Sequence, residues 1–137
     1  MSDKYHNVSN ISIDIALEAV KQGLKIAKKM GVMASITVVD RSMNLVAFGK
    51  ADGATPHSIE TSRKKANTSA STGKDTGWMQ GDLAISLPKA VDKLTNIPGG
   101  FPIKFSGKLV GGIGVAGGTV AQDSEIAMKT LRAIESE

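Results

Sequence analysis

Apolar positions recur every three or four residues in the first part of the chain. This spacing predicts an amphipathic helix over residues 11–30 that ends at Gly31. Residues 34–39 are rich in β-branched side chains, residues 40–44 have the composition of a turn, and an apolar run resumes over 45–48. The order of these segments predicts an antiparallel hairpin.

A second helix is predicted over residues 56–71. Thr55 can cap its start, proline is tolerated in its first turn, and Gly73 lies just past its end. The residues on its inward stripe are small, which lets a helix lie close to a sheet: Ser62, Ala66, Ser69 and Ala70.

The second half of the chain repeats the alternation of helix and hairpin. Within residues 72–100, apolar residues have helical spacing, but Pro88 interrupts them, so we expect a short turn and then a helix that begins near Pro88. Residues 102–105 and 108–115 predict a second hairpin. Asp123 can cap a closing helix.

Chain length and element order together indicate the fold class. At 137 residues the chain has the size of one domain, and we expect a flexible N-terminus over residues 1–10 and a single domain over 11–137. Hairpins placed between helices favour antiparallel strands covered by helices. The sequence therefore predicts an α+β fold.

Composition removes several classes of function. The chain contains no cysteine, which excludes disulfide scaffolds, thiolate zinc sites and a cysteine nucleophile. Its polar start does not resemble a signal peptide, and no apolar run reaches the roughly 18 residues of a membrane span. We expect a cytoplasmic protein that does not bind membranes.

The net charge of +4 is concentrated locally. Four of the lysines share one face of the first predicted helix, near its end, where the helix dipole favours cations. No aromatic side chain accompanies them, although nucleic-acid surfaces usually combine positive charge with stacking aromatics. We expect a solvated helix face and no nucleic-acid partner.

The glycine-rich segment 112–117 matches a dinucleotide-binding string. That motif requires a helix that starts within the glycines and a further strand, and too few residues remain for both. We interpret the glycines as positions that a helix or a neighbouring chain approaches closely. For the same reason we expect Gly114 to reject bulky side chains, and we expect oligomer contacts at this strand or at the small-residue helix.

His57 is the main candidate for binding a metal or cofactor. It stands in the predicted first turn of the second helix, where the positive helix end favours a neutral imidazole that can bind a metal. An exposed turn histidine is the alternative. Lys64 and Lys65, next to Arg63, can attract an anion or can simply form a wet helix face. No acid, base and nucleophile with suitable spacing are present, so no catalytic residue is predicted.

Short motifs along most of the chain resemble the GlcG/HbpS-like family. They are Val38-Val39-Asp40, Asp52-Gly53-Ala54, Lys65-Ala66-Asn67-Thr68, Gly99-Gly100-Phe101-Pro102-Ile103, the run Gly111 to Gly117, and Asp123. The resemblance implies a profilin-like three-layer α/β/α fold with a five-stranded antiparallel sheet, although the residue pattern itself indicates four strands. It also implies homo-oligomers and, for some members, tetrapyrrole binding.

The same resemblance suggests two functions. The first is a cytoplasmic, non-enzymatic accessory protein that binds haem or a corrinoid, linked to glycolate, glycerol or propanediol metabolism. His57 would then be the metal ligand, with Lys64 and Lys65 as further cofactor-binding residues. The second is an enzyme or sensor for a hydroxy-acid or diol metabolite at a pocket between subunits.

Overall fold

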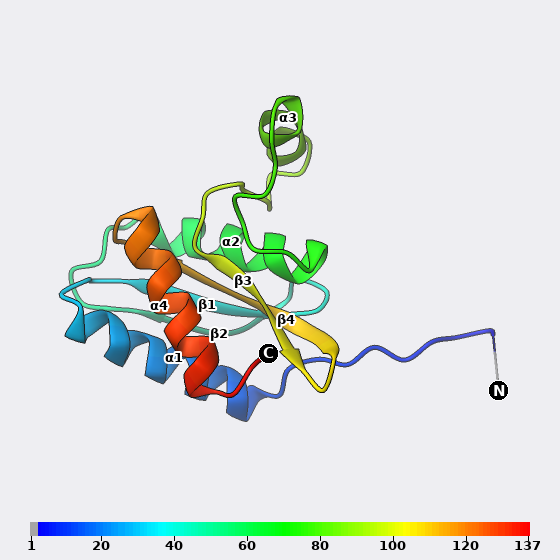
Figure 1. The fold of residues 1–137 in the computed structure, drawn as a ribbon, viewed down its shortest axis with the longest axis horizontal. Coiled ribbons are helices and arrows are strands. Elements are labelled where there is room, and N and C mark those ends of the chain that lie inside the picture. Colours follow the sequence, from blue (N-terminus) through cyan, green and yellow to red (C-terminus); the bar gives the residue numbers. More distant parts are fainter. Residues whose placement is uncertain (1–2) are drawn as a thin grey trace.

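The computed structural model describes residues 3–137; residues 1 and 2, part of the predicted flexible segment, lie outside the described residues. The elements follow the predicted alternation of helices and hairpins (Figure 1). They are α1 (Ile13–Lys29), β1 (Ser35–Asp40), β2 (Leu45–Lys50), α2 (Ser58–Thr72), α3 (Asp82–Ala90), β3 (Gly100–Phe105), β4 (Lys108–Ala116) and α4 (Val120–Ala133).

The strands form one antiparallel sheet in the order β2-β1-β4-β3. α2 packs on one face of this sheet, and α1 and α4 pack on the other (Figure 1). The α+β class and the three-layer arrangement are therefore confirmed. The fifth strand is not: the sheet of the described residues has four strands.

The segment between α3 and β3 does not add a strand to the sheet, because its backbone groups have other partners. The amide of Leu94 closes a turn on the carbonyl of Val91, and the amide of Thr95 donates to Thr68 Oγ1 of α2. These backbone groups are satisfied by a turn and by a helix side chain instead of a neighbouring strand. Two hairpins thus account for the sheet, as the residue pattern indicates.

α2 lies very close to β4 because the facing residues of both elements have small side chains or none. A Cβ atom added at Gly114 would meet the Ser62 carbonyl oxygen and lie 2.6 Å from the Ala66 nitrogen. Gly112 is equally close to Ala66 and Ala70. The close approach predicted at Gly114 is confirmed, and the approaching element is α2 of the same chain. The glycines of β4 and the small residues of α2 therefore pack against each other within one chain. This corrects the prediction that these two faces form oligomer contacts.

The opposite face of the sheet carries the main hydrophobic core. There the side chains of β1 and β4 pack against α1 and α4. Fully buried members include Ile36, Ile113, Val115, Ile126 and Ala16. Burial of this apolar surface, at roughly 25 cal/mol per Å², holds the outer helices on the sheet.

Pro88 does not start a helix, which corrects the prediction for this region. It lies inside α3, near the helix end, and no residue of α3 is buried. The carbonyl that loses its partner at Pro88 can therefore be hydrated, so the usual cost of an internal proline is reduced. In Figure 1, α3 projects away from the three layers.

Two helix caps also differ from the prediction. Thr119, not Asp123, caps α4: its hydroxyl accepts from the Gln122 amide, and the Thr119 amide donates to the Gln122 side-chain oxygen. At α2 the cap position is His57, and the Thr55 carbonyl accepts from Ser58 in the preceding turn. Within residues 3–137, no helix combines the length and apolar character needed to cross a bilayer.

Candidate functional site

His57 stands at the start of α2 with its side chain in solvent. The backbone is in the helical region, at φ −71° and ψ −15°, and the imidazole forms no capping hydrogen bond. The carbonyl of His57 accepts from the amide and hydroxyl of Thr61, one turn later. The backbone is thus held by hydrogen bonds, whereas the ring is exposed.

A buried ion pair lies further along the same side of α2. The Lys65 amine is 3.1 Å from Asp123 Oδ2 and donates to the Val115 carbonyl at 2.7 Å. The other oxygen of Asp123 accepts from the Gly118 amide at 2.8 Å. Burial lowers the pKa of the Lys65 amine below its ordinary value of 10.5, and the neighbouring Asp123 carboxylate opposes that shift. The pair joins α2, the end of β4 and the first turn of α4.

His57 and Lys65 line one cavity of about 300 Å³, called here the His57 cavity. Two partly exposed apolar side chains, Ile97 and Val120, lie at its wall and are 47% and 50% exposed. The remaining lining residues come from the start of α2 and the β4–α4 turn: Thr55, Ser58, Thr61, Ala116, Gly117, Gly118 and Asp123. The cavity therefore offers an imidazole and apolar contacts above a fixed ion pair.

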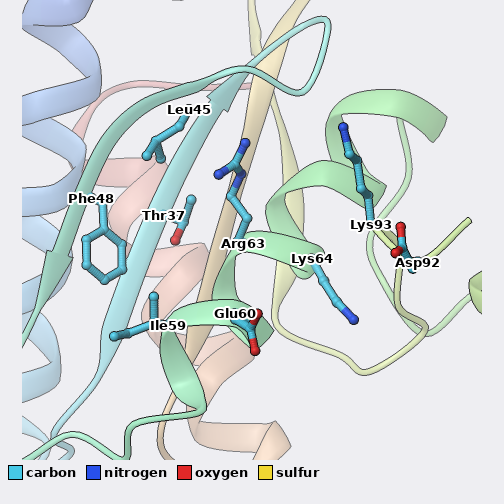
Figure 2. Close-up of a pocket in the computed structure, with 9 residues that line it drawn as sticks. All are labelled: Thr37, Leu45, Phe48, Ile59, Glu60, Arg63, Lys64, Asp92 and Lys93. Carbon is cyan, nitrogen blue, oxygen red and sulfur yellow. The ribbon is translucent and has the colours of Figure 1, made fainter.

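Lys64 is not brought to the His57 cavity. It lies on the neighbouring side of α2 and lines a groove next to β2 together with Arg63 (Figure 2). Of the three residues singled out from the sequence, the structure thus gathers His57 and Lys65 and separates Lys64 from them.

Asp123 belongs to the site and was assigned only a capping role from the sequence. The alternative of a wet helix face is wrong for Lys65, which is buried. One signal in the sequence indicates this: Lys65 stands next to Ala66 and three residues after Ser62, both of the predicted inward stripe. A cation on a buried helix face requires a compensating anion. Which carboxylate supplies it depends on the packing of α4 against the end of β4.

The described residues do not form a multidentate metal site. Within residues 3–137, no three histidine, cysteine, aspartate or glutamate side chains gather where they could hold a metal ion. A metal at His57 would have to bring most of its ligands with it.

Sequence relatives match most of the chain. An uncharacterised 15.0 kDa protein from Citrobacter freundii, from the dhaT–dhaS intergenic region, is 27% identical over 135 residues, covering 94% of this chain and 95% of its own. The GlcG protein of Escherichia coli K12 is 29% identical over 108 residues, or 77% of this chain and 81% of its own.

Solved structures share the fold. Klebsiella pneumoniae ORFY has a TM-score of 0.89 at 25% identity, covering 98% of this chain and 97% of its own. A double mutant of Streptomyces reticuli HbpS has a TM-score of 0.86 at 27% identity, with coverage of 97% and 92%. A PduOC:heme complex, at 24% identity, a TM-score of 0.86 and coverage of 93% and 97%, shows the shared fold alone.

A family model described as "Haem degrading protein HbpS-like" matches residues 11–132. That span includes every helix and strand but the last residue of α4. The chain therefore belongs to the HbpS-like family.

Proposed function

We propose that this protein is a non-enzymatic haem-binding accessory protein in which His57 is an axial ligand of the iron. The observation that carries the proposal is the exposed His57 imidazole, free of any capping bond, at a cavity that also presents Ile97 and Val120. An imidazole is one of the side chains that hold haem iron in proteins, and an apolar wall suits the face of the porphyrin.

A haem suits the donor set of this cavity. The porphyrin supplies four nitrogen ligands, so one histidine is sufficient to anchor the iron, whereas a bare ion would need several side chains. The cavity, at about 300 Å³, is at the lower end of the range for small-molecule pockets. One chain would cover only part of a haem, and a second copy of the chain would cover the rest.

Binding without turnover is supported by the state of the acidic group. Asp123 is the carboxylate among the described lining residues of the His57 cavity, and its two oxygens are engaged by Lys65 and Gly118. The cavity lining within the described residues therefore presents no carboxylate that is free of a protein partner. Lys65 is engaged in the same way, so its part in the site would be to hold the cavity floor.

The comparisons support haem over a corrinoid. The family description, which names haem degradation, and the PduOC structure of the same fold, which is a heme complex, both involve haem. Degradation of haem by this chain would contradict the non-enzymatic part of the proposal. The names of the relatives described above do not mention a corrinoid. The link to glycolate, glycerol or propanediol metabolism stays a prediction.

Titration of the purified protein with haemin tests the proposal. We expect saturable binding with a shifted Soret band, and we expect His57→Ala to change the band and weaken binding. His6→Ala is the matched control, because His6 is exposed in the N-terminal segment and lines a different cavity. It should leave spectrum and affinity unchanged.

Two further ligands separate iron ligation from ring binding. Iron-free protoporphyrin IX should bind with an affinity that His57→Ala leaves unchanged, since only the iron contacts the imidazole. Cobalamin should bind far more weakly than haemin. An unaltered Soret band in His57→Ala would rule out His57 as the ligand, and sedimentation of the haem-loaded protein as a monomer would refute the role of a second copy.

A further inference from the structure

A groove on the other side of α2 is separate from the His57 cavity. α2 packs over β4, β1 and β3, and leaves the adjacent face of the edge strand β2 open. The resulting groove has a volume of about 480 Å³ (Figure 2). This size lies within the range of about 300–1,000 Å³ that small-molecule pockets occupy.

The floor of the groove is apolar and exposed. Phe48 pairs with Thr37 and Leu45 pairs with Val39, and directly paired residues project from the same face of a sheet. Thr37 contacts Ser62 of α2, so Phe48 and Leu45 also point to the α2 side, beyond the reach of the helix. Together with Ile59 they are between 38% and 51% exposed.

Arg63 supplies an unsatisfied cationic group in this groove. Its Nε atom is buried and has no hydrogen-bond partner, and its Nη2 atom makes only a long bond of 3.4 Å to the Met43 carbonyl. Among residues 3–137, Arg63 forms no ion pair. A buried donor without a partner is costly, and a carboxylate can accept two parallel bonds from a guanidinium.

The other charges around the groove balance. Lys64 and Lys93 are matched by Glu60 and Asp92, so Arg63 leaves the lining with one positive charge. Figure 2 shows the Arg63 side chain directed toward Leu45, whereas the Glu60 and Lys64 side chains point away from the strands. The unpaired guanidinium therefore lies at one end of the apolar floor.

We propose that this groove binds a monocarboxylate with an apolar body, whose carboxylate pairs with Arg63 and whose apolar part lies on Leu45, Phe48 and Ile59. The proposal is independent of haem binding, because the two cavities have no lining residue in common.

Calorimetry of the full chain with octanoate tests this site. We expect one saturable site, with binding at least about tenfold weaker for octanamide, which has the same chain but no charge, since bonds to charged groups contribute roughly 1.5–3 kcal/mol. Glycolate, a carboxylate without an apolar body, should also bind at least about tenfold more weakly. Absence of octanoate binding, or equal affinity for octanamide, would overturn the proposal.

Variants assign the binding to the groove. Arg63→Gln should weaken octanoate binding by about tenfold or more and leave octanamide unaffected, whereas Phe48→Ala should weaken both. Arg132→Gln, which changes an exposed arginine in the last turn of α4, is the control and should alter neither. His57→Ala should also leave octanoate binding intact. Equal octanoate affinity in folded Arg63→Gln or Phe48→Ala protein would place the ligand elsewhere.

Discussion

The Lys65 amine lies 3.1 Å from a carboxylate oxygen of Asp123, and their side chains are only 2% and 4% exposed. This contact connects two helices on opposite faces of the sheet (Figure 1). It lies at the end of β4, and both residues line the His57 cavity. Each charge is tolerated in the interior because the other is present, together with the Val115 carbonyl and the Gly118 amide.

Asp123→Asn should reduce the free energy of unfolding by about 3–5 kcal/mol, because it leaves the Lys65 charge buried without a counterion. Urea denaturation measures the loss. The double variant Lys65→Met/Asp123→Asn should recover much of it, since no buried charge remains. Glu125→Gln breaks the exposed pair with Lys129 and is the control, with an expected change below about 1 kcal/mol.

Stability should depend on pH in the alkaline range through Lys65. Its pKa is lowered in the folded protein, so between that value and 10.5 the unfolded chain binds more protons than the folded one. In this window the free energy of unfolding rises with pH. Urea denaturation between pH 8 and about pH 11 should show the wild type gaining stability relative to Lys65→Met. A relative loss would mean that the folded pKa is raised instead.

Gly114→Val should lower stability by about 1–3 kcal/mol or more, because the new side chain would push against the α2 backbone at Ser62 and Ala66. Thermal melting measures the effect. Lys108→Val adds the same side chain at an exposed position of the same strand and should change stability by no more than about 0.5 kcal/mol. The elution volume of the folded variant should not change, since Gly114 contacts its own chain. A shifted volume with an unchanged melting temperature would contradict this packing.

Backbone amides of α3 should exchange with deuterium much faster than those of α2. α3 buries no residue, whereas α2 buries eight of its side chains against the sheet and the loops around it. Segments with few buried contacts open locally at low free energy. Hydrogen-exchange mass spectrometry measures both helices in one sample, and equal protection would show that something covers α3 in solution.

Local signals were sufficient for most of the secondary structure. Apolar spacing predicted α1, and turn composition together with β-branched runs predicted both hairpins. Gly31 and Gly73 stand where the helices end, both with positive φ, as expected of residues without a Cβ atom. These features depend on neighbours within a few positions, and such neighbours are visible in the chain.

Features that depend on distant residues were decided by the tertiary structure. Asp123 looks like a helix cap along the chain, yet it is the partner of Lys65, 58 residues away. The unpaired guanidinium of Arg63 faces an open groove only because α2 packs on β4, β1 and β3 and does not cover Phe48 on β2. Periodicity determines which residues form an element. The energy of a buried charge, and whether a groove stays open, depend instead on which residues pack against it, and the packing of the layers decides that.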